Sequence, residues 1–146
     1  MKTVAPPIRK GQRGVTAIEF ALVATAFFIF LIGIMEMGRV LFYWNTAAEV
    51  TRLGARTAAV CDKDDAVIKA KMVALLPILR TNDINISYYP AGCTAGSCEL
   101  ITVSVAAGTP IATFIPFVPL SLTMPAFTTT LTKESMDSSG GNPVCQ

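Results

Sequence analysis

The sequence predicts an α+β fold with a long N-terminal helix, a second short helix and a small antiparallel sheet. Residues 20–35 form an apolar run without a charge, and helical spacing of apolar residues continues for about 25 positions beyond it. In the second half of the chain, apolar and polar residues alternate, which is typical of strands. A length of 146 residues accommodates one domain in addition to the long helix.

The apolar run reaches the thickness of a membrane only if its helix begins near Val15. Residues 20–35 alone would span about 24 Å, less than the roughly 30 Å of a bilayer's hydrocarbon core. A helix over residues 15–35 spans about 32 Å, but it then contains Glu19. Because a carboxylate in a membrane helix is costly, Glu19 needs a partner.

A free amine at Val15 would be such a partner. If a peptidase cuts after Gly14, the new N-terminus lies one helical turn from Glu19, and both the amine and the helix dipole favour a carboxylate there. A neighbouring copy could supply the same amine. The plainer interpretation is an uncleaved signal anchor with a glutamate at its edge.

Charges on either side of the apolar run predict its orientation. The preceding segment carries basic residues and no acidic ones, so the N-terminus should stay cytoplasmic and residues after about 36 should face outward. Four basic residues beside a membrane helix do not indicate a nucleic-acid-binding arm. An ordinary cleaved signal peptide is disfavoured, because the small residues lie within the run and not at its end.

The first helix should continue well past the membrane. No proline interrupts residues 35–60, and two pairs of opposite charge have helical i,i+3 spacing, Glu36 with Arg39 and Glu49 with Arg52. We therefore expect one helix of about 45 residues, with a transmembrane half and an exported half. An aromatic belt at the membrane surface is expected from three consecutive residues, Phe42, Tyr43 and Trp44.

The first 60 residues carry several short motifs in a fixed order. These are Arg13-Gly14, Glu19-Phe20-Ala21, Glu36-Met37-Gly38-Arg39 and Gly54-Ala55-Arg56-Thr57-Ala58-Ala59. A glycine before the cut, a glutamate at the fifth mature position and an aromatic residue at the sixth resemble the processing signature of type IV pilins of the Flp/Tad branch. The whole segment resembles the TadE-like family, the minor pilins or pseudopilins of the Tad (tight adherence) pilus system. Phe20 stands where major Flp pilins usually have tyrosine, which favours a TadE-like component.

The resemblance implies a membrane-anchored structural component that a prepilin peptidase processes between Gly14 and Val15. Glu19 and Phe20 would act in assembly, and the remaining family motif residues are Glu36, Gly38, Arg39 and Arg56. Its expected partners are the bacterial inner membrane, other pilins and pseudopilins, and the Tad inner-membrane platform. The C-terminal domain would be periplasmic and could enter an extracellular pilus. The alternative is a single-pass periplasmic adaptor that never enters the pilus.

All four cysteines lie on the outward side of the predicted span. An even number confined to the exported part indicates disulfides in an oxidising compartment. Of the three possible pairings we favour Cys93 with Cys98, which closes a short loop, and hence Cys61 with Cys145. Free buried thiols are the other interpretation; a zinc site is disfavoured, because the chain has no histidine and no CxxC pair.

The exported domain should contain the second helix and the sheet. Residues 65–79 show a helical apolar stripe after candidate capping aspartates, and Pro77 should end or kink that helix. Residues 84–89 and 100–105 alternate like the strands of a hairpin, with the Cys93–Cys98 loop between them. Prolines exclude a central strand in residues 108–119, which we expect to form a buried crossing or a partner or membrane contact. One or two further strands are expected between residues 120 and 131.

Five segments follow from these patterns: a leader (1–14), a transmembrane helix (15–36), its outer extension (37–60), an exported domain (61–134) and a polar tail (135–146). The chain lacks histidine, nucleophile motifs and phosphate-binding loops, so we expect no enzyme, no cofactor and no nucleic-acid partner. The aspartates at positions 62–65 lack the glycine and distal glutamate of a calcium loop, and they are better interpreted as a helix start.

Overall fold

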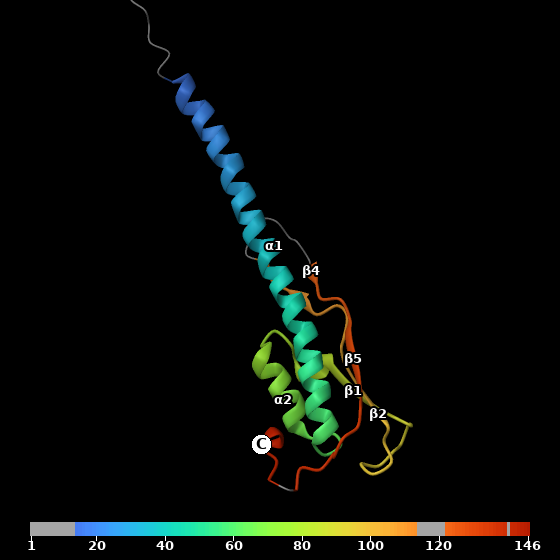
Figure 1. Ribbon diagram of the computed structural model, residues 1–146. Helices are drawn as coiled ribbons and strands as arrows, with labels where there is room; N and C mark the ends of the chain where they lie inside the picture. Colours follow the sequence, from blue (N-terminus) through green and yellow to red (C-terminus); the bar gives the residue numbers. More distant parts are fainter. Residues whose placement is uncertain (1–13, 114–121, 140) are drawn as a thin grey trace, which may run out of the picture. The chain divides into compact units, whose positions relative to one another are not determined.

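The computed structural model describes residues 14–113, 122–139 and 141–146. The predicted leader, except for Gly14, and the second half of the proline-rich segment lie outside these residues. The chain forms two compact units, residues 1–35 and residues 36–146, and each is described by itself. The second unit contains both short helical and strand elements, which confirms the predicted α+β class (Figure 1).

Helix α1 runs without interruption from Val15 to Val60, a length of 46 residues, as the sequence predicted. From Val15 to Met35 none of its side chains is buried. After Met35, buried side chains recur on one face, and most of them are small. Within the described residues, α1 is the one helix whose length and composition suit a membrane crossing. An apolar helix near the N-terminus therefore fits a single-pass anchor.

Helix α2 (Ala66–Leu75) begins where the sequence predicted and ends earlier. The Asp65 carboxylate caps it by accepting a hydrogen bond from the Val67 amide at 3.0 Å. The expectation that it extends to about residue 79 was wrong. Leu76 leaves the helical conformation because the ring of Pro77 disfavours α geometry in the residue before it.

A three-stranded antiparallel sheet contains β1 (Ile84–Tyr89), β2 (Leu100–Val105) and β5 (Phe127–Thr132) in the order β1-β2-β5. The predicted hairpin is present, with Tyr89 opposite Leu100 and Ile84 opposite Val105. The structure also contains a two-stranded ribbon of β3 (Pro110–Ile111) and β4 (Leu122–Thr123). This pairing was not predicted from the sequence. The proline of the ribbon occupies the first position of a short strand, where no ladder hydrogen bond is lost.

The core of the second unit lies between the outer half of α1, α2 and the sheet. Gly54 of α1 is buried against Met72 of α2, and a Cβ atom at Gly54 would lie 2.5 Å from the Met72 Sδ atom. A side chain at position 54 would therefore force the Met72 thioether to shift. The inward residues of β2, including Ile101 and Val103, are fully buried in the same cluster.

Two disulfides close the second unit, in the pairing that the sequence favoured. Cys61, which follows α1, is bonded to Cys145 in the tail, and Cys93 is bonded to Cys98 at the end of the β1–β2 hairpin. The tail is therefore tied to α1, and a short 3₁₀ helix, η2 (Pro143–Cys145), precedes the chain end. Another 3₁₀ turn, η1 (Thr81–Asp83), leads from α2 into β1.

Candidate functional sites on the first helix

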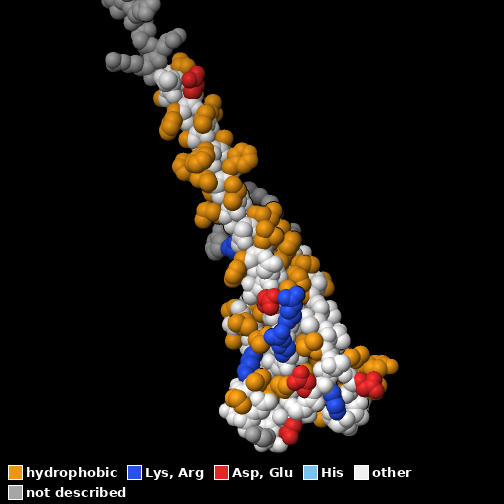
Figure 2. Space-filling model, viewed as in Figure 1, with side chains coloured by type: hydrophobic (Ala, Val, Ile, Leu, Met, Phe, Trp, Pro, Cys, Tyr) orange, Lys and Arg blue, Asp and Glu red, His pale blue; other side chains and the backbone are white. Residues whose placement is uncertain are grey.

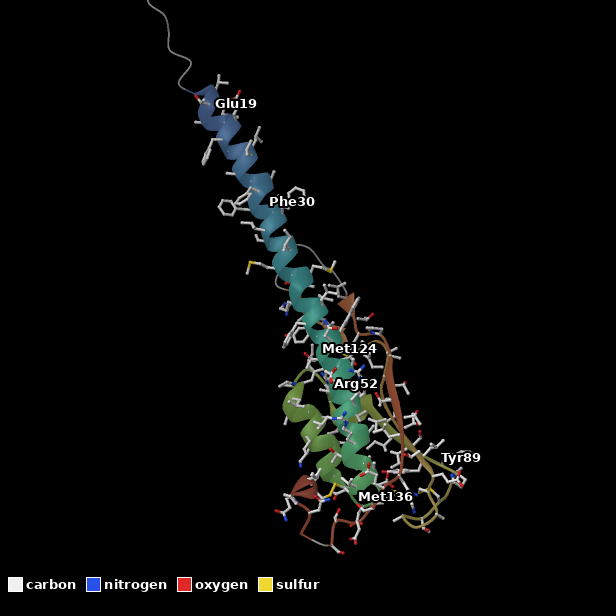
Figure 3. All side chains as sticks on the ribbon, viewed as in Figure 1. Glu19, Phe30, Arg52, Tyr89, Met124 and Met136 are labelled. Atoms are coloured by element: carbon white, nitrogen blue, oxygen red, sulfur yellow. A yellow bond between two sulfur atoms is a disulfide. The ribbon has the colours of Figure 1, made fainter. Side chains whose placement is uncertain are left out.

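The residues of the predicted processing and assembly site lie at the start of α1. Gly14 is exposed directly before the helix, and its carbonyl accepts a hydrogen bond from the Ile18 amide at 3.4 Å. Val15 is 52% exposed and Phe20 is 75% exposed. The Glu19 side chain projects from the same turns (Figure 3), and within the described residues no hydrogen bond or ion pair involves it. This end of the helix therefore presents the predicted processing and assembly residues outward.

The apolar run after Glu19 presents large side chains on every side of the helix. Orange side chains project along the visible face of this part of α1 in the space-filling view (Figure 2). Phe28, Phe30 and Ile34 are between 59% and 73% exposed. Apolar side chains on all faces of one helix are stable when lipid or other apolar helices surround them.

Glu36 and Arg39 form the predicted ion pair and also contact a distant segment. The Arg39 guanidinium donates to the Glu36 carboxylate and to the backbone carbonyl of Ala112, just after β3. It also lies 5.7 Å from the centre of the Tyr43 ring. Glu36 is only 8% exposed. The pair therefore joins α1 to the β3 region of its own domain.

The hydrogen bond to Glu36 raises the pKa of Arg39 above its ordinary value, against an opposing effect of desolvation. A charge held in this way has a defined position on the helix. The guanidinium can therefore hold the Ala112 carbonyl and the Glu36 carboxylate at the same time.

The other two family-motif residues lie apart from this pair. A Cβ atom added at Gly38 would meet nothing within 4 Å, so the helix surface there is open within the described structure. Arg56 is exposed about five turns further along α1, and within the described residues it makes no hydrogen bond or ion pair. Of the four family-motif residues, Glu36 and Arg39 therefore form an ion pair, which we call the Glu36–Arg39 clamp, and Gly38 and Arg56 are exposed.

Sequence reasoning missed the role of Ala112 and the packing of two of the three aromatic residues on the core. Nothing in the local pattern around Ala112 distinguishes it as an acceptor for Arg39. Tyr43 and Trp44 are half-buried against the domain core, and Phe42 is 63% exposed. The aromatic belt at a membrane surface stays a prediction. The close approach of Gly54 to Met72 had a signal, the small residues between positions 54 and 59.

Acidic side chains do not gather into a metal site in the part of the chain that the structure describes. No group of three or more potential ligands is found there, and all four cysteines are in disulfides. Asp65 serves as the cap of α2, in agreement with the interpretation of residues 62–65 as a helix start.

Comparison with known proteins identifies the first part of the chain. No curated protein and no solved structure matches it. The family model described as TadE-like protein matches residues 14–56, a stretch that contains the predicted processing site, the apolar run and the Glu36–Arg39 clamp. Residues 14–56 are thus a TadE-like segment, as the sequence resemblance predicted.

Proposed function

We propose that this chain is a minor pilin or pseudopilin, a membrane-anchored structural component of Tad pilus biogenesis. The TadE-like match over residues 14–56 carries this proposal. It is supported by an apolar helix segment that the described residues leave uncovered. The family is a structural, pilus-related one, and the chain is proposed to act by assembly and not by catalysis.

In this proposal the protein first resides in the bacterial inner membrane. Lys2, Arg9, Lys10 and Arg13 hold the leader in the cytoplasm, and the domain after residue 36 faces the periplasm. A prepilin peptidase then cuts between Gly14 and Val15. The five proposed segments are those expected from the sequence: 1–14, 15–36, 37–60, 61–134 and 135–146.

Assembly would exchange lipid for the helices of other subunits. The side chains from Val15 to Met35 are exposed, so they can make that exchange without any change in the domain. The Glu19 carboxylate would pair with the Val15 amine of a neighbouring subunit, because a carboxylate in an apolar medium is stable only when its charge is compensated. This pairing would set the axial register of the helices.

Mass spectrometry of the mature chain tests the processing step. We expect the first residue to be Val15 in the wild type, and we expect a Gly14→Ala variant to remain uncut. Detection of Met1 at the N-terminus of the protein from assembled material contradicts the proposal.

Glu19 is tested by comparing Glu19→Leu with Glu49→Leu. Both changes replace a helix carboxylate by the same apolar residue, but Glu49 lies in the exported half and pairs with Arg52. We expect both variants to insert into the membrane and only Glu19→Leu to lose assembly. Equal assembly of both variants argues against a role for Glu19.

The alternative function is that of a periplasmic adaptor of the secretion machinery that is never incorporated. The observation that favours it is that residues 36–146 form a compact unit with its own core and disulfides. Site-specific crosslinking from Phe42 distinguishes the two functions. A ladder with the major pilin supports incorporation, and crosslinks to platform proteins alone support the adaptor.

A further inference from the structure

The second unit carries a groove that the described residues leave open. It has a volume of about 450 Å³ and lies between the end of α1, the end of β5 and the tail. Its lining is mostly apolar and includes Leu53, Val60, Leu131 and Val144. Arg56 lines it as well, and within the described residues this guanidinium has no hydrogen bond or ion pair. The groove thus offers an apolar surface beside an unpaired cation.

The far end of the β1–β2 hairpin carries a complementary projection. Tyr89 and Leu100 face each other across the hairpin and are 61% and 37% exposed. Glu99 lies beside them, and its carboxylate makes no ion pair among the described residues. Tyr89 projects from the hairpin in Figure 3. We call Tyr89, Glu99 and Leu100 the hairpin knob.

The loop next to the hairpin knob is held by a disulfide and by hydrogen bonds to its carbonyls. The Cys93–Cys98 disulfide closes this loop. The Lys133 ammonium group donates to the carbonyls of Ala95 and Gly96, and Lys63 donates to the Cys93 carbonyl at 2.9 Å. A preorganised projection loses little conformational entropy when it docks.

Within the described structure, no residue of the hairpin knob lines the groove of its own chain. Leu100 and Thr132 are opposite each other in the sheet and point to its outer face, whereas the neighbouring pair Ile101 and Leu131 points toward α1. Leu131 therefore reaches the groove from the inner face of the sheet, whereas Tyr89 and Leu100 of the knob project from the outer face.

We propose that the groove receives the hairpin knob of a second copy of this chain. The Tyr89 ring would lie on the apolar wall formed by Leu53 and Leu131, and the Glu99 carboxylate would pair with Arg56. Tyrosine and arginine are residue types that contribute strongly at the centres of interfaces. Because the groove and the knob are different surfaces, the contact is head-to-tail and extends into an open chain of copies. It deepens the proposed function, since it specifies a contact between the outer domains of neighbouring subunits.

The test measures self-association of the full-length mature chain in detergent micelles by sedimentation velocity. We expect a concentration-dependent series of oligomers. Arg56→Glu and Glu99→Arg should each weaken association by about tenfold or more. An equimolar mixture of these two variants should restore association, since every groove then meets a knob of opposite charge.

Three further variants isolate the contact from other causes. Tyr89→Ala should weaken association about as much as Arg56→Glu. Lys69→Glu makes the same charge reversal on α2 outside the groove and should leave association unchanged. Phe42→Ala should also leave it unchanged, because Phe42 lies on α1 away from both surfaces. Circular dichroism of each variant checks that the domain is folded.

Glu134 also lines the groove, so its carboxylate could compete for Arg56. Glu134→Gln should therefore leave association unchanged or strengthen it. A chain that stays monomeric at all concentrations, or a mixture of Arg56→Glu and Glu99→Arg that fails to associate, overturns the proposal. That outcome is distinct from failure of the proposed function, which is read from the N-terminus of the mature chain.

Discussion

The two halves of α1 share one helical backbone and differ in what surrounds their side chains. From Val15 to Met35 no side chain is buried, although nearly every one is apolar. From Glu36 to Val60 one face is buried against the domain, and Ala47, Ala55 and Ala58 on that face are fully buried. The first half uses large side chains that need an external apolar environment. The second half uses small side chains that let its own domain approach closely.

The comparison shows that apolar composition alone does not tell what a helix packs against. A buried helix inside its own domain has an apolar stripe on one side, as in residues 47–59. A helix that is apolar on every side has no polar face for water, as in residues 20–35. The uninterrupted length of the apolar run in residues 20–35 distinguishes this part of α1 from a helix that is buried in a domain core.

The largest expected loss of stability comes from removing the Cys61–Cys145 disulfide, both of whose cysteines lie in the second unit. Replacing Cys61 and Cys145 by serine frees a loop with a sequence separation of 84 residues. We expect a loss of about 4–5 kcal/mol in the free energy of unfolding, because the unfolded chain regains the entropy of that loop. Denaturant unfolding of the domain measures it. The control pair Cys93→Ser and Cys98→Ser, with a separation of 5, should cost about 2 kcal/mol.

The same Ile→Ala substitution should have different effects on the free energy of unfolding in the two units, because the side chains are buried in one and exposed in the other. Ile101 is fully buried in the sheet, so Ile101→Ala should lower the free energy of unfolding by about 2–5 kcal/mol. Ile29 is 65% exposed, and Ile29→Ala should change it by less than about 0.5 kcal/mol in detergent. Similar losses for both variants would mean that residues 15–35 also pack against the domain.

The small-residue face of the second half can be tested at Gly54. A Cβ atom there would lie 2.5 Å from the Met72 Sδ atom, whereas one at Gly38 would meet nothing within 4 Å. Gly54→Ala should destabilise the domain by about 1 kcal/mol, because forced repacking exceeds the gain in helix propensity. Gly38→Ala should not lower the midpoint of thermal unfolding. A stabilised Gly54→Ala variant would show that α2 is free to move away.

The smallest expected effect is a loss of stability in alkali that depends on Tyr88. Burial raises the pKa of Tyr88 above its ordinary value of 10.0, although a hydrogen bond from the Asp64 amide to its hydroxyl opposes the shift. The folded state therefore holds this proton more firmly than the unfolded state. The stabilising contribution of Tyr88 to the folded state is therefore complete below its ordinary pKa. It is lost as the pH rises through the raised pKa of the folded state.

Denaturant midpoints between pH 8 and pH 11 measure this loss. Tyr88→Phe should remove the decline that Tyr88 causes, and Tyr89→Phe serves as the matched control, because Tyr89 is 61% exposed. An unchanged decline in Tyr88→Phe would assign the alkaline loss to another group.

Much of the fold could be predicted because its causes are local. An unbroken helical pattern predicted α1, alternation predicted the β1–β2 hairpin, and cysteine spacing favoured the pairing that the structure contains. Even the missed end of α2 had a local cause, since Pro77 acts on the residue before it. The motifs that predicted a TadE-like segment are also local, and the family match covers them.

Only the tertiary structure decided which side of each element is covered. Arg39 meets a carbonyl that lies 73 residues away in the chain, and the Gly54 surface meets a methionine on another helix. Tyr43 and Trp44 pack on the core, although their position suited a membrane surface. Helical or strand spacing specifies which residues share a face. The partner of that face depends on how distant segments pack, and this information is absent from any short stretch of sequence.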